Sequence, residues 1–489
     1  MTTNNPLNLN NPTLFKTACF IDGDWTLAKS GAVIAVHNPF NGDFLGNVPD
    51  LSAEEVAHSV TAAANAQKSW AKLTAAARGK ILDTWADLID ANLEDLARIL
   101  TLEQGKPLVE AKGEINYANS YIRWYAEEGK RVYGDVIPAP NPALRYTILK
   151  QPIGVCAAIT PWNFPSAMIT RKVAPALAAG CVMIVKPDTQ TPFSALALME
   201  LARQAGVPEG VLQVVTGDAA TVGGVLTSDT RVHKLSFTGS TAVGKLLMSQ
   251  CASTVKKLSL ELGGNAPFII FDDADLDKAI DGLMVSKYRN AGQTCVCANR
   301  IYVQKGIKDK FLKRFAEKLN SLTVGNGLDE GVTIGPLIND KALEKVQGLL
   351  QDALDKGATL IAGGDKNPVS KLAFNPTIIT DITPDMDIFS QEIFGPIAPV
   401  FVFDTEEEVL ELANDTLYGL AAYFYTKDLG RSWRVSEGLE YGMVAQNTGL
   451  LSTEVAPFGG VKQSGFGREG SKYGIEDYIS IKYWCAQVG

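Results

Sequence analysis

The sequence predicts an α/β protein with two parallel sheets, each in a domain of its own. Length is the first observation: 489 residues exceed what one hydrophobic core usually serves, so two or three domains are expected. The second observation is a regular alternation of short apolar runs and amphipathic stretches that starts near residue 153, and the third is a similar series that starts near residue 268. Strands and helices that alternate in this way form parallel sheets with helices on both faces.

The expected elements follow in chain order. Residues 53–102 are rich in alanine and leucine and should be helical, and the proline-dense run 137–142 should be a linker or turn. The first series has expected strands at 153–159, 182–185, 211–215 and 234–237, and expected helices at 166–179 and 194–204. The second series, which should begin a new domain near Gly263, has expected strands at 268–271, 301–303 and 398–401 and a helix at 308–321.

Polar and glycine-rich turns follow the strands of the first series. Ligands of parallel sheets bind beyond the carboxyl ends of the strands, so a row of such turns predicts a nucleotide site. The turns are residues 160–165, 186–189, 216–217 and 238–240.

Charge and composition disfavour several classes of function. A net charge of −9 and the lack of a dense basic stripe argue against binding to DNA or RNA. The polar N-terminus shows no secretory signal, so a cytoplasmic protein is expected. The longest apolar run, 173–185, is too short to span a bilayer and contains Pro175 and Gly180, so no membrane segment is expected.

The cysteines and histidines bear on redox environment and metal binding. Seven scattered cysteines, an odd number, suit a reducing compartment better than a disulfide framework. None of the three histidines has a second histidine or a cysteine at zinc-ligand spacing, so no metal site is expected. Because histidine is scarce, a general base should be a carboxylate.

Cys295 is the strongest candidate for a catalytic residue. It lies in the run 292–297, whose polar flanks predict a loop, although a core position is the commoner place for a cysteine. A thiol can attack a carbonyl carbon and hold the acyl group as a thioester, and a carboxylate can activate the water that releases it. Glu261, in a second dense run at 261–265, is the candidate carboxylate. The pair predicts covalent chemistry on an aldehyde or an acyl compound.

Two glycine-rich runs match nucleotide-binding motifs in part. Residues 465–470 have the glycine pattern of a dinucleotide fingerprint, but too few residues follow for a βαβ unit, so we interpret them as a turn. Residues 239–245 copy most of a P-loop, with 269–273 as the candidate metal-binding strand, which makes an NTPase the rival hypothesis. Leu246 stands where a P-loop needs a hydroxyl for magnesium. The turn can still offer backbone N–H groups to a pyrophosphate, and an ordinary helix start is the alternative.

Six motifs together resemble the aldehyde dehydrogenase family over nearly the whole chain, from Phe20 to Tyr483. The motifs are residues 161–165, 237–240, 261–265, 292–295, 391–396 and 457–460, in the family's order. The resemblance implies a Rossmann-type dinucleotide-binding domain, an α/β catalytic domain and a small β oligomerisation element. The expected bounds are 1–122 and 147–262 for the first, 263–470 for the second, and 123–146 and 471–489 for the third. It also implies a homotetramer or homodimer.

The resemblance implies a role for each catalytic residue. Cys295 would attack the aldehyde carbon, and the Asn163 amide with the Cys295 backbone N–H would stabilise the oxyanion of the thiohemiacetal. Hydride would pass to a nicotinamide, and Glu261 would activate water against the thioester. A non-catalytic protein that kept the fold is a rival that the presence of all three residues disfavours.

The resemblance extends to the cofactor site. Lys186 resembles the residue that binds the adenine-side ribose, Ser240 the pyrophosphate contact, and Glu392 the carboxylate on the nicotinamide ribose. Thr189 stands where family members restricted to NAD often carry a glutamate that repels a 2′-phosphate, so NADP is favoured. NAD is the alternative, because Asp188 lies beside Thr189. The other residues expected at this site are Thr160, Trp162, Gly217, Gly239 and Phe394.

Two arginines indicate the class of aldehyde. Arg171 and Arg289 lie near the catalytic runs, and a guanidinium pairs bidentately with a carboxylate on a substrate. The alternative is that each is a solvated helix residue or part of an internal ion pair. The runs 168–173 and 289–297 look like the succinate-semialdehyde dehydrogenase branch, in which two arginines and a serine, here Ser452, hold the substrate carboxylate. Glutarate semialdehyde is the alternative substrate.

Cys297 adds a regulatory hypothesis. A disulfide to Cys295 across one residue would be strained and easily reduced, and it would block the nucleophile. Some members of the same branch are thought to use this pair as a redox switch. The alternative is that Cys297 is a packed thiol.

Overall fold

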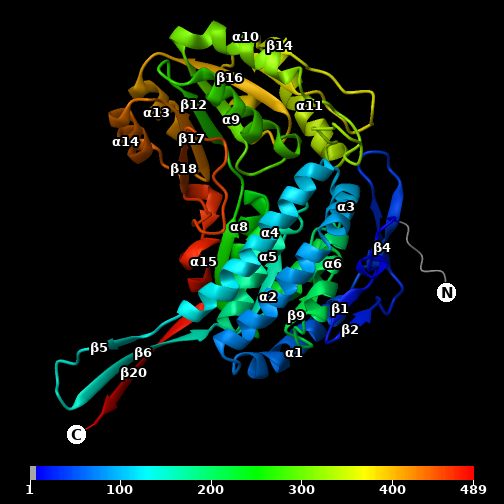
Figure 1. The fold of residues 1–489 in the computed structure, drawn as a ribbon, viewed down its shortest axis with the longest axis vertical. Coiled ribbons are helices and arrows are strands. Elements are labelled where there is room, and N and C mark those ends of the chain that lie inside the picture. The colour runs from blue at the N-terminus through cyan, green and yellow to red at the C-terminus, as the bar shows by residue number, and fades with distance from the viewer. Residues whose placement is uncertain (1–6, 489) are drawn as a thin grey trace.

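A computed structural model describes residues 7–488, and within them it has the predicted α/β architecture. An eight-stranded sheet and a seven-stranded sheet form two separate bodies, accompanied by a three-stranded and a two-stranded sheet. Figure 1 shows the two large bodies one above the other, with a thin β arm that projects from the lower body. No helix in the described range is long and apolar enough to cross a membrane.

The first sheet has the order β19-β11-β10-β7-β8-β9-β1-β2. Its central strands are parallel, and β7 and β8 are almost wholly buried, which is why they read as continuous apolar runs in the sequence. The parallel strands are β7 (Val155–Ile159), β8 (Val182–Lys186), β9 (Leu212–Val214), β10 (Val232–Thr238) and β11 (Lys257–Glu261). The antiparallel edge strands are β1 (Cys19–Ile21), β2 (Asp24–Thr26) and β19 (Gly465–Phe466).

Helices cover this sheet on both faces, as the alternation predicted. Those that connect its strands are α5 (Ala167–Ala179), α6 (Pro192–Gln204), α7 (Ala219–Ser228) and α8 (Thr241–Cys251). The helical stretch predicted at 53–102 is α1 (Ala53–Trp70), α2 (Ala75–Ala91) and α3 (Leu93–Gln104), and α4 (Leu108–Glu128) continues it. A capping box between Ser52 and Glu55 begins α1. Helix α4 packs against α2, α3 and α5, so the N-terminal helices belong to the body of the first sheet.

The second sheet has the order β14-β15-β16-β13-β12-β17-β18, and all its neighbouring strands are parallel except β14 and β15. Its strands are β12 (Ala266–Ile270), β13 (Ala298–Gln304), β14 (Thr359–Ala362), β15 (Thr377–Thr380), β16 (Ile397–Phe403), β17 (Ala421–Tyr425) and β18 (Met443–Gln446). Its helices are α9 (Leu276–Tyr288), α10 (Lys308–Leu319), α11 (Asp340–Asp355), α12 (Asp387–Ser390), α13 (Glu406–Asn414) and α14 (Leu429–Gly438).

The β arm consists of β5 (Asp135–Ile137), β6 (Leu144–Pro152) and β20 (Ile479–Gln487), in the order β20-β6-β5. The proline-dense run forms the turn between β5 and β6, as predicted. Residue 147, the expected start of the second part of the nucleotide-binding domain, lies inside β6, so we propose to end the arm at Pro152. Residues 123–128 belong to α4, which packs in the first body rather than in the arm.

Two smaller features complete the fold. Strands β3 (Val33–His37) and β4 (Phe44–Pro49) form a separate antiparallel pair. Helix α15 (Ser471–Glu476) packs against α4 and α5, and β19 pairs with β11, so the C-terminal segment returns from the second body to the first. The glycine-rich run 465–470 is therefore part of this return and opens no βαβ unit.

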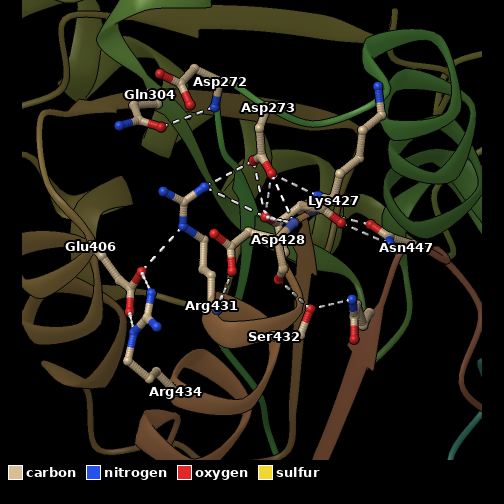
Figure 2. Close-up of polar contacts among 12 residues, drawn as sticks. Asp272, Asp273, Gln304, Glu406, Lys427, Asp428, Arg431, Ser432, Arg434 and Asn447 are labelled. Atoms are coloured by element: carbon tan, nitrogen blue, oxygen red, sulfur yellow. Dashed lines mark hydrogen bonds and ion pairs between the residues drawn. The ribbon is translucent and has the colours of Figure 1, made fainter.

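A polar cluster follows β12 in the second body and bears on the NTPase hypothesis (Figure 2). The Asp273 carboxylate accepts hydrogen bonds from the hydroxyl of Thr426, from the backbone N–H groups of Lys427 and Asp428, and from the Arg431 guanidinium. These contacts fix the loop that begins α14. Because Asp273 is committed to them and follows a strand of the second sheet, it does not serve the P-loop-like turn, which follows β10 of the first sheet.

Candidate active site

The turns that were predicted to bind a nucleotide lie in a row at one edge of the first sheet. Strands β10, β7, β8 and β9 are parallel neighbours in this order, so their carboxyl ends meet at the same edge. Gly239, Thr160, Lys186 and Gly217 stand at or just after those ends. The backbone N–H of Thr160 donates to the Lys186 carbonyl at 3.1 Å, which joins two of the turns directly.

Cys295 lies where two cavities meet. One cavity, of about 320 Å³, has Cys295, Arg171, Arg289 and Ser452 in its lining. The other, of about 340 Å³, is lined by Cys295 and by six of the residues predicted for catalysis or cofactor binding: Trp162, Asn163, Gly239, Ser240, Glu392 and Phe394. A nucleophile at such a junction can face a substrate on one side and a cofactor on the other.

The loop that carries Cys295 depends on close backbone approaches. A Cβ atom on Gly264 would lie 2.3 Å from the Cys295 carbonyl oxygen, so only glycine fits there. Gly292 has a φ of +74°, and a Cβ atom on it would lie 2.3 Å from the Gly395 carbonyl oxygen. Three motifs that are far apart in the sequence, at 261–265, 292–295 and 391–396, are therefore in backbone contact around the nucleophile.

The Cys295 thiol is half-buried and protonated at neutral pH. Burial raises the pKa of Cys295 to about 12, and the nearby Arg171 guanidinium opposes this rise only in part. The thiol therefore has to give its proton to a base when it attacks.

Asn163 is fixed next to the nucleophile by four hydrogen bonds. Its side-chain amide donates to the Gln293 carbonyl at 3.1 Å, and its amide oxygen accepts from the Phe164 N–H. Its backbone carbonyl accepts from Lys106 Nζ at 2.8 Å and from the Asn290 amide at 3.0 Å. The Asn163 amide has a second N–H, and its place in the lining of the cofactor cavity lets that group meet an oxyanion on Cys295.

Glu261 ends β11 and is buried, with 3% of its surface exposed. Neither carboxylate oxygen has a hydrogen-bond partner among the described residues. Burial first and the nearby Glu469 carboxylate second raise the pKa of Glu261 well above its usual range. Glu261 is not among the residues that line the two cavities, but its negative charge contributes to the raised pKa of Cys295, so the carboxylate lies within electrostatic reach of the nucleophile.

Arg171 lies on α5 and is buried, with its charge balanced inside the protein. Its guanidinium forms an ion pair with Glu469 at 2.5 Å and stacks over the Phe458 ring at 3.9 Å. Glu469 also pairs with Lys172, which donates to the Thr238 hydroxyl at 2.6 Å. The sequence did not point to Glu469, because it lies inside the glycine-rich run 465–470 and no short-range pattern links it to Arg171.

Arg289 differs from Arg171 in having no ion-pair partner among the described residues. It is half-buried, its Nε has no hydrogen-bond partner in the described range, and its guanidinium lies 5.3 Å from the centre of the Phe164 ring. Ser452 lines the same cavity. The structure therefore brings the three residues predicted to bind a substrate carboxylate into one cavity with Cys295.

The second cavity has the donors and acceptors that a nicotinamide dinucleotide needs. Ser240 begins α8 and accepts a hydrogen bond from the Val243 N–H, so the positive end of a helix faces this cavity. Glu392 accepts from the Gly264 N–H at 3.0 Å, and burial raises the pKa of Glu392 to about 7. The rings of Trp162 and Phe394 lie edge to face at 5.6 Å. Such a cofactor fits this cavity, which has N–H groups that can bind its phosphates, a carboxylate that can accept from ribose hydroxyls, and aromatic walls.

Three further residues were predicted around the adenine-side ribose. Lys186 is buried, its ammonium group donates to the adjacent Pro187 carbonyl at 3.2 Å, and burial lowers its pKa. Thr189 lines a neighbouring crevice of about 650 Å³. The Asp188 carboxylate accepts from the Gln190 N–H at 2.9 Å, so this oxygen is turned back onto its own chain. Thr160 is also buried, and its hydroxyl has no hydrogen-bond partner among residues 7–488.

Cys295 and Cys297 are both free thiols in this structure. Cys297 is buried and its sulfur lies 3.5 Å from Lys287 Nζ and 3.4 Å from the Lys287 carbonyl oxygen. Burial raises the pKa of Cys297, and the Lys287 ammonium group opposes the rise. The regulatory disulfide stays a hypothesis.

Comparison with known proteins finds similarity over nearly the whole chain. The model of the aldehyde dehydrogenase family matches residues 25–484. A succinate-semialdehyde dehydrogenase [NADP(+)] of Escherichia coli K12 is 58% identical over 98% of this chain and 99% of its own. A 3-sulfolactaldehyde dehydrogenase of Pseudomonas putida is 58% identical, and a glutarate-semialdehyde dehydrogenase of Pseudomonas aeruginosa is 56% identical, each over 98% of this chain and 99% of its own. A crystal structure of an aldehyde dehydrogenase from Brucella melitensis biovar abortus 2308 is 60% identical and has a TM-score of 0.97 over 99% of both chains.

Proposed function

Because this chain belongs to the aldehyde dehydrogenase family, we propose that it oxidises succinate semialdehyde to succinate with NADP⁺ as the hydride acceptor. The observation that carries the proposal is the position of Cys295 between a cavity that contains two arginines and a cavity suited to a nicotinamide dinucleotide. The P-loop NTPase hypothesis is excluded by the family match and by the contacts of Asp273.

The proposed chemistry uses three residues of this chain. The Cys295 thiol gives its proton to the ionised Glu261 carboxylate, which passes it to solvent, and the sulfur attacks the aldehyde carbon. The Asn163 amide and the Cys295 N–H stabilise the oxyanion of the thiohemiacetal. The cofactor, when bound, supplies the acceptor for the hydride that this carbon loses as the thioester forms. Glu261, in its ionised form, then takes a proton from water, and the hydroxide attacks the thioester. The carbon–sulfur bond breaks to release the acid, and the Cys295 thiolate takes the proton from Glu261 to become a thiol again.

The choice of substrate rests on charge. The three relatives named above act, by their names, on aldehydes that carry a second, anionic group, either a carboxylate or a sulfonate. A guanidinium without an ion-pair partner beside Cys295 suits such a group, and Arg289 is in that state within the described range. Glutarate semialdehyde is the second candidate, because relatives of nearly equal identity bear that name.

The preference for NADP⁺ rests on the residues after β8. Thr189 offers no carboxylate to repel a 2′-phosphate, and one oxygen of the neighbouring Asp188 is occupied by the Gln190 N–H. The relative from Escherichia coli is named for the same cofactor.

We also propose that the chain forms a homodimer or homotetramer through the β arm. The arm exposes apolar side chains, among them Val136, Ile481, Tyr483 and Trp484, with 56–81% of their surfaces accessible. Such a patch on a two-sided, projecting sheet is typical of an interface.

The test follows reduced cofactor by absorbance during turnover of succinate semialdehyde and glutarate semialdehyde, with NADP⁺ and NAD⁺ in parallel. We expect the highest kcat/KM with succinate semialdehyde and NADP⁺, and no turnover by Cys295→Ala. Glu261→Gln should release about one equivalent of reduced cofactor in a burst and then stop, because the thioester is not hydrolysed. Wild-type protein that is folded and reduced but oxidises only uncharged aldehydes would contradict the proposal.

A further inference from the structure

Glu110 lines the substrate cavity, although no motif in the sequence points to it. It lies in the first turn of α4, half-buried, and shares the lining with Cys295 and Arg289. An acid in a cavity that is expected to admit an anionic substrate opposes that substrate, so its presence there requires a reason.

The first reason is mechanical. The Glu110 carboxylate accepts a hydrogen bond from the Asn290 backbone N–H at 2.8 Å. Asn290 and Ala291 have φ values of 52° and 54°, in the left-handed region that residues with a Cβ atom rarely adopt. Two adjacent residues in this region need anchors from outside their own turn. Glu110 supplies one anchor, and the Asn290 amide, which donates to the Asn163 carbonyl at 3.0 Å, supplies another.

This turn carries the nucleophile segment. Gly292 follows it directly, and the Gln293 carbonyl accepts from both the Asn163 amide and the Asn290 amide. A shift of the turn would therefore move Cys295 and the amide of Asn163 relative to each other.

The second reason is electrostatic. Among the described residues Glu110 forms no ion pair within 4.0 Å, and neither does Arg289. The guanidinium of Arg171, by contrast, is already balanced by Glu469. Arg289 and Glu110 therefore both face the substrate space without an ion pair of their own. The cations whose charges act on Glu110 are Lys106, which is already paired with Glu114, and Arg289. A substrate carboxylate that reaches Arg289 has to compete with Glu110 for its positive charge.

We propose that Glu110 is a positioning residue that anchors the left-handed turn before Cys295 and weakens the binding of a substrate carboxylate by Arg289. The inference rests on the proposed function, since it takes the substrate to be an anionic aldehyde. The anchor supports turnover. The weaker binding by Arg289 lets the product, which keeps the carboxylate of the substrate, dissociate from the site.

The test separates the two roles with two substitutions. Glu110→Gln keeps an oxygen for the Asn290 N–H but removes the charge, whereas Glu110→Ala removes both. Steady-state kinetics with saturating NADP⁺ compare succinate semialdehyde with butanal, which has the same chain length and no carboxylate. Glu127→Gln, an exposed position at the end of the same helix, is the matched control.

With Glu110→Gln we expect KM for succinate semialdehyde to fall about three- to tenfold, the effect of removing one like charge from a half-buried site, and KM for butanal to stay within about twofold. The kcat for butanal should stay within about twofold of the wild-type value, because the amide oxygen keeps the anchor, whereas the kcat for succinate semialdehyde should fall, because the product carboxylate is bound more tightly. An unchanged or higher KM for succinate semialdehyde would overturn the electrostatic role.

With Glu110→Ala we expect kcat to fall at least about tenfold for both aldehydes, and the rate of Cys295 alkylation by iodoacetamide to change in the absence of substrate. A wild-type kcat in a variant of normal thermal stability would overturn the anchoring role. The proposed function has a separate readout: if the wild type shows no preference for succinate semialdehyde over butanal, that function and the electrostatic role fail, while kcat with butanal still decides the anchoring role.

Discussion

At the scale of single residues, the two arginines of the substrate cavity differ in how their charges are balanced. Arg171 is buried against Glu469 and Phe458, and Arg289 has no ion-pair partner in the described range. Breaking a buried pair leaves an uncompensated charge, whereas removing an unpaired arginine removes only an interaction with the ligand. The two residues should therefore respond differently to the same substitution.

Arg289→Leu should raise KM for succinate semialdehyde about 10- to 100-fold and leave the melting temperature nearly unchanged, because a lost charge-assisted contact costs about 1.5–3 kcal/mol. Arg171→Leu should lower the free energy of unfolding by about 2–5 kcal/mol, since Glu469 keeps only Lys172 as a partner. Steady-state kinetics and denaturant unfolding on both variants check this. An equal loss of stability in both variants would contradict this difference in how the two arginines are paired.

Glu392 should make cofactor binding depend on pH. Burial raises the pKa of Glu392 to about 7, so the carboxylate is mostly ionised at pH 8 and mostly protonated at pH 6. A protonated carboxyl is a weaker acceptor for ribose hydroxyls, so KM for NADP⁺ should rise by up to about tenfold as the pH falls from 8 to 6. Glu392→Gln should have a raised KM for NADP⁺ that no longer rises through protonation of this carboxylate as the pH falls. An identical pH profile in the variant would assign the dependence to another group, such as the 2′-phosphate.

At the scale of elements, the start of α4 connects the N-terminal helices to the catalytic centre. Lys106, just before α4, is buried and donates to Glu114 at 2.6 Å and to the Asn163 carbonyl at 2.8 Å. Glu114 in turn accepts from the Ser166 and Ala167 N–H groups at the beginning of α5. The buried Lys106–Glu114 pair thus connects the N-terminus of α5 with Asn163, the residue proposed to stabilise the oxyanion.

Lys106→Met should lower the free energy of unfolding by about 3–5 kcal/mol, because Glu114 loses its buried counter-charge. The kcat should fall as well, since Asn163 loses one of the two donors to its carbonyl. Glu114→Gln added to Lys106→Met should restore part of the stability. Lys112→Met, which removes a solvent-accessible ion pair between α4 and Glu94 of α3, is the control and should cost less than about 1 kcal/mol. Denaturant unfolding that gave equal values for Lys106→Met and the control would contradict this role.

At the scale of the whole molecule, the arm projects away from the body of the first sheet (Figure 1). Strand β20 pairs with β6 over its whole length, yet most of its side chains are exposed, apolar ones included. Exposed apolar strands of this kind are an aggregation hazard unless another chain covers them.

Replacing Ile481 and Trp484 together with glutamate should therefore reduce the assembly to smaller species, because buried carboxylates would destabilise the interface. Sedimentation velocity on the variant and the wild type measures this. Leu429→Glu, an equally exposed apolar position on α14, serves as the control and should leave the mass unchanged. If the assembly of the variant kept the wild-type mass, the chains would have to associate through another surface.

Local sequence determined the alternating strands and helices. Helix α5 was predicted at 166–179 and is Ala167–Ala179, and β8 was predicted at 182–185 and is Val182–Lys186. Fully buried parallel strands need continuous apolar runs, which a sequence displays directly. Strands β1 and β2 were missed, because three residues are too few for a pattern. The sequence also identified the family, since the nucleophile and its neighbours must be particular residue types within short runs.

The tertiary structure alone decided which of these residues meet. The order β10-β7-β8-β9, which makes a row of the nucleotide turns, is set by strand pairing that no local pattern encodes. The convergence of Arg171 and Arg289 on one cavity and the contact between Glu110 and Asn290 join segments that are distant in the chain. Burial then set the ionisation of Cys295, Glu261 and Glu392, because a pKa depends on desolvation and on neighbouring charges in space. Residue types were therefore fixed locally, whereas their charges and partners were fixed by the fold.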